Sequence, residues 1–132
     1  MSPLTAAREQ LKTTLSTITG VSVHDTLPEK VAPPAVVVLP DEPYIDTAAD
    51  QLPYGYGWAR FQVALIVGKG TTPKQYTDLD DLIGQALEAL YGDDSVDWTT
   101  QTVDEPTSLP LNSTQHLHTR MHVRATWHMR TT

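Results

Sequence analysis

"WARFQVALIV", residues 58–67, alternates polar and apolar side chains and therefore predicts a β-strand with one buried face. Its apolar side comprises Phe61, Val63, Leu65 and Val67. Arg60 and Gln62 fall on the opposite side, because successive side chains of a strand point to opposite faces of the sheet. We expect this strand to lie against a core on one face only.

A helix is predicted after the turn "GKGTTP", running to about Tyr91. A capping box formed by Thr72, Pro73 and Gln75 favours one start, and Thr77 with the aspartates that follow it favours another, one turn later. Either start buries the same face, which comprises Tyr76, Leu79, Leu82, Ile83, Ala86, Leu87 and Leu90. Gly92 is a natural end for this helix.

A first helix is predicted from about Pro3 to Thr19, with Ser2 as its N-cap and Gly20 at its end. Its apolar stripe consists of Leu4, Ala7, Leu11, Leu15 and Ile18. "VSVHD" (21–25) alternates as a short strand, and the valine-rich "AVVVLP" (35–40) predicts a strand buried on both faces and closed by Pro40. A weaker strand is expected at about 95–103, followed by a turn-rich segment to Ser113.

Residues 41–57, "DEPYIDTAADQLPYGYG", show no sustained periodicity and are expected to form a long loop. Long ordered loops are often functional, so Tyr44, Tyr54 and Tyr56, with the adjacent Trp58, are candidates for contacts with a partner. The alternative is a hairpin connection whose tyrosines fold back on the core.

"HLHTRMHVRATWH", residues 116–128, predicts a last strand with one polar and one apolar face. The polar face carries His116, His118, Arg120, His122, Arg124, Thr126 and His128. A metal site using His116, His118 and His122 is conceivable, but Arg120 and Arg124 on the same face would repel a cation. A solvated surface and a subunit-contact or channel-lining surface are the other interpretations. A contact surface predicts association that depends on pH around the ordinary histidine pKa, about 6.5.

The order helix, three strands, helix, two strands favours an α+β fold: a mainly antiparallel β-sheet of about five strands with two α-helices packed on one face. A length of 132 residues suits a single domain, 1–132. The chain has no cysteine, which excludes disulfides and thiolate catalysis. It also lacks a nucleophile motif, an apolar run of about 20 residues and the apolar stretch of a signal peptide. We therefore expect neither an enzyme nor a membrane protein.

Charge is divided unequally along the sequence, whose net charge is -7. All 16 acidic residues precede His116, whereas the last 17 residues carry three arginines and no acid. The acidic total argues against broad binding to a phosphate backbone. A basic last strand on an acidic body could steer association between copies, or could simply be solvated.

The layout resembles the lambda-type tail terminator proteins of long-tailed phages, particularly those of siphoviruses that infect actinobacteria. The resemblance rests on the opening helix to "ITGVSV", "APPAVVVLP", "WARFQVALIVG", "LDDLIGQALEALYG" and the last strand, and it covers nearly the whole chain. It implies a structural virion protein of the tail and neck, assembled in the host cytoplasm, with no enzymatic activity and no cofactor. Such subunits form a hexameric ring that caps the tail tube, stops its elongation and joins it to the head.

The partners implied are further copies of the chain, the major tail tube protein and head-neck connector proteins, with no membrane and no sequence-specific nucleic acid, although DNA passes through the ring. Family members vary in the segment corresponding to 41–57. Three alternatives stay open: a head-completion or stopper protein of the neck, a histidine-based metal-binding module or hydrolase, and a monomeric adaptor that docks through Tyr44, Tyr54 and Tyr56.

Overall fold

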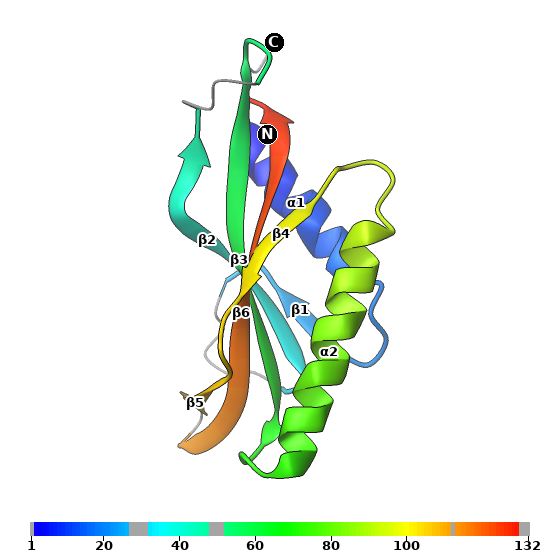
Figure 1. Ribbon diagram of the computed structural model, residues 1–132, viewed down its shortest axis with the longest axis vertical. Coiled ribbons are helices and arrows are strands. Elements are labelled where there is room, and N and C mark those ends of the chain that lie inside the picture. The colour runs from blue at the N-terminus through cyan, green and yellow to red at the C-terminus, as the bar shows by residue number, and fades with distance from the viewer. Residues whose placement is uncertain (1, 27–31, 48–51, 112, 130–132) are drawn as a thin grey trace.

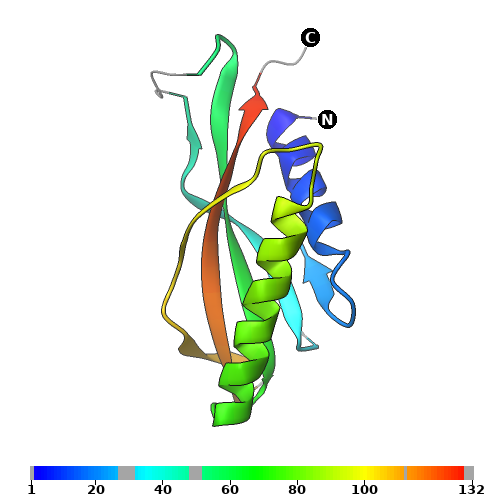
Figure 2. The same ribbon diagram turned by 45° about the vertical axis from the view of Figure 1, so that its right-hand side comes forward.

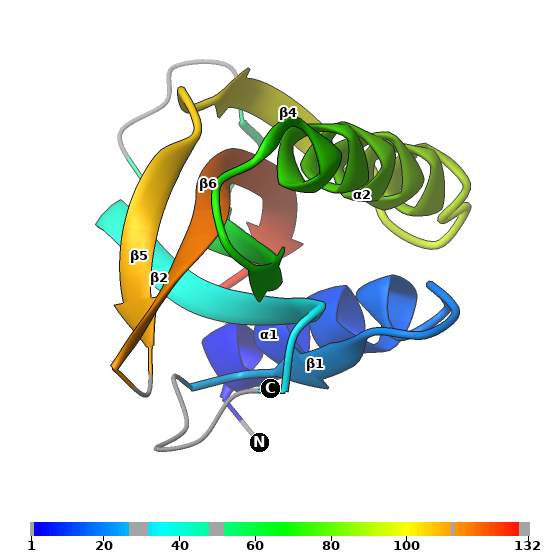
Figure 3. The same ribbon diagram turned by 90° about the horizontal axis from the view of Figure 1, so that it is seen from below.

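Six strands form one sheet, and two helices cover one of its faces (Figures 1 and 3). The computed structural model describes residues 2–26, 32–47, 52–111 and 113–129. The elements are α1 (Pro3–Leu15), β1 (Ser22–His24), β2 (Ala35–Asp46), β3 (Tyr56–Lys69), α2 (Pro73–Tyr91), β4 (Thr99–Val103), β5 (Thr107–Leu111) and β6 (Thr114–His128). Neither helix in these ranges is long and apolar enough to cross a membrane.

The strand order is β1-β2-β3-β6-β4, and β5 also pairs with β6. Only β1 and β2 are parallel; every other pairing is antiparallel. β6 therefore has β3 along one side and shares its other side between β4 and β5. The predicted α+β class is confirmed, with six strands where about five were expected.

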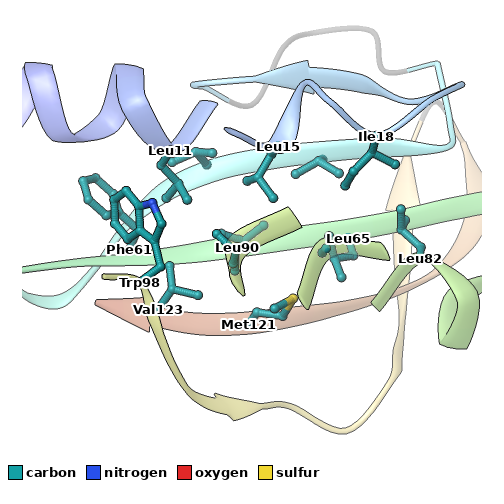
Figure 4. Close-up of a cluster of buried hydrophobic side chains, with 14 of the residues drawn as sticks. Leu11, Leu15, Ile18, Phe61, Leu65, Leu82, Leu90, Trp98, Met121 and Val123 are labelled. Atoms are coloured by element: carbon teal, nitrogen blue, oxygen red, sulfur yellow. The ribbon is translucent and has the colours of Figure 1, made fainter. Parts of the chain in front are cut away.

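The alternation predicted for the two central strands is confirmed. Phe61 pairs with Val123 and Val63 with Met121, and all four side chains are fully buried toward the helices. Figure 4 shows Phe61, Leu65, Met121 and Val123 meeting Leu11, Leu15, Leu82 and Leu90 from the two helices. Arg60 and Gln62 point to the opposite face, which the helices leave uncovered (Figure 2).

The helices follow their predicted starts more closely than their predicted ends. Ser2 Oγ accepts a hydrogen bond from the Thr5 amide at 3.1 Å, and α1 stops at Leu15, four residues before the expected end, although Ile18 is still buried in the turn that follows. α2 begins at the earlier of its two candidate starts, where the Thr72 amide donates to Gln75 Oε1 at 3.2 Å. The expectation that Tyr76 is buried was wrong, since this residue is 48% exposed.

β2 does not end at Pro40, as the sequence suggested, but continues to Asp46. β1 covers only its first three residues, so beyond Val37 β2 is an edge strand, where a missing proline N–H costs no ladder hydrogen bond. A register shift between Pro40 and Ile45 bends the strand. The loop expected at 41–57 is therefore shorter, and its ends belong to β2 and β3; residues 48–51 lie outside the described ranges.

The segment between α2 and β6 also differs from the prediction. β4 begins at Thr99 rather than near Ser95, and β5 occupies part of the segment expected to be turn-rich. On the uncovered face, Leu109 and Leu111 of β5 pack with Leu39 against a small second cluster, whose buried members are Ala35, Val37, Ala64 and Ile66. One end of that face is thus apolar, and its remainder carries polar side chains.

Candidate functional site

A charged network occupies the uncovered sheet face. Its members, which we call the arginine face, are Asp41, Arg60, Gln62, Asp104, Arg120, His122 and Arg124. They come from β2, β3 and β6 and from the residue that follows β4. Because alternate residues of β3 and β6 face the helices, the polar residues between them necessarily line the other side.

His122 lies between two carboxylates. Its Nδ1 is 3.1 Å from Asp41 Oδ2, and its Nε2 is 3.0 Å from Asp104 Oδ1. The Asp41 side chain is only 4% exposed, and it also accepts hydrogen bonds from Gln62 Nε2 at 3.0 Å and from the Glu42 amide at 2.8 Å. The last strand itself contains no acid, but neighbouring segments bring acids to its polar face. That face is therefore partly neutralised within the subunit.

The contacts of the arginine face shift the pKa values of its titratable groups. Burial alone would lower the pKa of His122, but hydrogen bonds to Asp104 and Asp41 and their negative charges outweigh burial and raise it. Burial would raise the pKa of Asp41, but hydrogen bonds from Gln62, the Glu42 amide and His122 lower it. Both shifts favour the charged pair, an imidazolium held by carboxylates.

The three arginines have few partners. Arg120 Nη1 donates to Gln62 Oε1 at 2.8 Å, and Arg60 Nη2 is 3.9 Å from Asp41 Oδ2. Arg124 stacks on Trp58, with its guanidinium carbon 4.0 Å from the ring centroid. These contacts place the three guanidinium groups together on the uncovered face of the sheet. Trp58 therefore lies within β3 beside the arginine face, and not in the loop before that strand.

The histidines proposed as metal ligands are not brought together as a ligand set. His116 and His118 are buried, 6% and 8% exposed, and their Nδ1 atoms lie 3.0 Å from the carbonyl oxygens of Val67 and Thr107, respectively. Both ring nitrogens of His122 face carboxylates. Within the described ranges, no group of three or more His, Cys, Asp or Glu side chains is arranged to hold a metal ion. His116 and His118 are thus too buried to contact a partner, whereas Arg120, His122 and Arg124 on the same predicted contact surface are only partly buried.

The loop tyrosines occupy two different environments. Tyr54 and Tyr56 are 89% and 40% exposed and line a shallow recess with Pro53 and Met129 at the end of the β2–β3 hairpin. Tyr44 instead packs edge-on against Phe61, with ring centroids 5.6 Å apart. Tyr54 and Tyr56 thus keep the exposure that a contact role requires, whereas Tyr44 has the core-packing role that was the alternative.

Sequence patterns missed Asp41 and Asp104 as members of the site. Asp41 fell in a segment expected to be a loop, and Asp104 follows a weakly patterned strand. Their partner His122 is 81 and 18 residues away, respectively, so no local spacing links them. Arg60 and Gln62 could have been included, since the alternation already set them on the polar side of their strand.

No protein-family model and no curated protein sequence matches this chain. The layout of its elements and the arrangement of its own side chains are therefore the grounds for a functional proposal.

Proposed function

We propose that this chain is a structural virion protein, a tail terminator of a long-tailed phage. It acts by forming a ring on the tail tube, which stops tube elongation and provides the joint to the head-neck. The order α1-β1-β2-β3-α2-β4-β5-β6 is compatible with the layout on which the resemblance to that family rests.

The observation that carries the proposal is the exposed end of the β2–β3 hairpin. Figure 1 shows the start of β3 reaching beyond the helices at one end of the molecule. Tyr54 and Tyr56 are exposed there, and tyrosine is enriched at protein contacts because it combines a large apolar ring with a polar tip. A projecting end of this kind suits contact with a neighbouring ring or tube.

Assembly of the purified full chain, alone and with isolated tail tubes, tests the proposal. Native mass measurement and negative-stain imaging should give six-fold rings or particles attached to tube ends. A protein that stays monomeric and never associates with tubes would refute the proposal. Attachment to head connectors without capping of tubes would instead assign the chain to the head-completion or stopper proteins.

Tyrosine variants refine this test. Tyr54→Ala with Tyr56→Ala should weaken tube capping while leaving the fold intact. Tyr91→Ala is the matched control, because Tyr91 is 67% exposed on α2, away from the hairpin end. Equal capping by both variants would remove the hairpin end from the mechanism.

A further inference from the structure

Two arginines face each other at the centre of the uncovered sheet face. Arg60 on β3 is directly opposite Arg124 on β6. Like charges directly opposite each other on neighbouring strands destabilise a sheet. The nearest carboxylate to Arg60 is Asp41 at 3.9 Å, and within the described ranges Arg124 and Arg120 have no carboxylate within salt-bridge distance. Asp41, which is shared with His122, is thus the one carboxylate at salt-bridge distance from the pair within the described ranges, and Arg124 has none.

The hydrogen-bonding capacity of these arginines is also largely unused. A guanidinium carries five N–H donors, yet among the residues that the structure describes Arg124 makes only its stacking contact with Trp58, and Arg120 makes one hydrogen bond to Gln62. The Nε atoms of Arg60 and Arg124 are buried without a partner. Planar guanidinium groups held in this way match carboxylates, which they bind through two parallel hydrogen bonds. The missing partner is thus expected to be an anion.

The chain itself supplies such anions. It has 16 acidic residues against nine lysines and arginines, so a second copy offers carboxylates, whereas the net charge of -7 opposes the approach of a polyphosphate. The acids suited to this role are those that face solvent without forming an ion pair inside the subunit.

An acidic stripe on α2 has two members, Asp81 and Glu88, that meet this requirement. It consists of Asp78, Asp81 and Glu88, which lie on one side of the helix and line the groove between α2 and the segment after α1. Asp78 is paired with Lys74 at 2.9 Å, but Asp81 and Glu88 are exposed and form no ion pair within the described ranges. Figure 3 shows α2 on the side of the sheet opposite to the uncovered face.

We propose that the α2 acidic stripe of one copy binds the arginine face of the next copy. The spacings are comparable: Arg120 and Arg124 are about 13 Å apart along an extended strand, and Asp81 and Glu88 are about 10 Å apart along a helix. The two surfaces differ and lie on opposite sides of the subunit, so the contact is head-to-tail, which closes into a ring when the rotation between copies permits it. This inference rests on the proposed function and specifies which surfaces of two copies meet.

Charge reversal with cross-complementation tests the contact. The face variant carries Arg120→Glu and Arg124→Glu; the helix variant carries Asp81→Arg and Glu88→Arg. Each variant alone should lose at least about tenfold in self-association, because like charges now meet at every contact. Mixing the two variants should restore rings in which they alternate, since each face then meets a helix of opposite charge. Asp94→Arg, at an exposed residue beyond α2, is the control with the same charge change as one helix substitution.

The outcomes separate this inference from the proposed function. Rings restored by mixing the two variants support the contact. A helix variant that assembles like the wild type overturns it. This second result holds even if the face variant fails to fold, because Asp81 and Glu88 are surface residues and their replacement leaves the fold intact. If every variant forms rings as well as the wild type does, the inference is overturned and the terminator function still stands. A wild-type protein that neither self-associates nor binds tubes overturns both.

Discussion

Asp41 on β2 and His122 on β6 are 3.1 Å apart, from Oδ2 to Nδ1, although β3 runs between their strands. The bend in β2, marked by the register shift between Pro40 and Ile45, lies where Asp41 reaches over the middle strand. Gln62 on that strand donates to the same carboxylate, so three strands are joined by one buried acid. The link holds the edge of the sheet to its centre.

This pair predicts a pH-dependent stability. The pKa of His122 is raised above its ordinary value of 6.5, so its contribution to the free energy of unfolding is fully present below about pH 6.5 and is lost as the pH rises through the higher folded value. His122→Gln should therefore destabilise the protein most at about pH 6 and progressively less toward about pH 9. Denaturant titrations of both proteins across this range would measure the difference.

Asp41, Asp104 and Arg60 are the charged groups in or next to this pair. The pKa of Asp41 is lowered, so its contribution to the free energy of unfolding is present above pH 3.8. It is lost only as the pH falls through the pKa of the folded state. The effect of His122 can therefore be isolated at neutral pH. A constant difference between wild type and His122→Gln over the whole range would contradict the prediction.

Asp93 should stabilise the packing of α1 against the turn after α2. Its carboxylate accepts hydrogen bonds from Thr14 Oγ1 at 2.7 Å and Trp98 Nε1 at 3.0 Å, and also from Ser95. Burial would raise the pKa of Asp93, but these hydrogen bonds, with one from Gln10, lower it well below its ordinary value. Asp93→Ala should cost about 2 kcal/mol in the free energy of unfolding at pH 7.

The matched control for Asp93 is its exposed neighbour Asp94, whose replacement by alanine should change stability by less than about 0.5 kcal/mol. The stabilisation by Asp93 is present above pH 3.8 and is lost as the pH falls through the lowered pKa of Asp93 in the folded protein. Equal unfolding midpoints for Asp93→Ala and Asp94→Ala at pH 7 would show that the network contributes nothing.

Tyr44 should behave as a core residue and not as a contact residue. Its ring packs edge-on against the fully buried Phe61, so Tyr44→Ala should lower the free energy of unfolding by about 1–3 kcal/mol. Tyr44→Phe keeps the ring and should be close to neutral. Thermal unfolding, with Tyr91→Ala as the exposed control, distinguishes the cases; a Tyr44→Ala protein as stable as that control would mean the contact is not stabilising.

A measurement of bound zinc tests the alternative that this chain is a histidine-based metal-binding module. Nδ1 of His116 and of His118 is directed at a backbone carbonyl oxygen, and both nitrogens of His122 are engaged by carboxylates, so we expect purified protein to hold zinc well below one equivalent. Elemental analysis after dialysis measures this. One tightly held equivalent of zinc that is lost in His118→Ala would favour the metal-binding module instead.

The sequence predicted the parts of the fold that depend on local periodicity. β3 alternates in burial from Tyr56 to Val63 and β6 from Thr119 to Thr126, and the start of α2 carries a local capping signal at Thr72, so these elements were placed correctly. The strand predicted for β2 ended too early, at Pro40, because the sequence does not reveal that this part of the strand lies at an edge of the sheet. β5 was missed because its ladder depends on pairing with β6, which no pattern inside β5 reports.

The candidate site was predictable only in part for the same reason. Alternation placed Arg120, His122 and Arg124 on one polar face, and the structure has them there. The acids that charge and position His122 come from two other segments, and their approach depends on the bend of β2 and on the turn after β4. Charge counted along the sequence therefore overstated how basic this face is.

The prolines of β2 have a consequence for how copies can add to one another. Beyond its three residues paired with β1, this strand carries Pro40 and Pro43 at the open edge, and β4 at the other edge has a register shift between Thr100 and Thr102. An incoming strand would find an incomplete row of N–H donors on one side and an irregular one on the other. Addition of a strand is thus disfavoured along these parts of the two edges, which guards the chain against fibres that grow by strand pairing there.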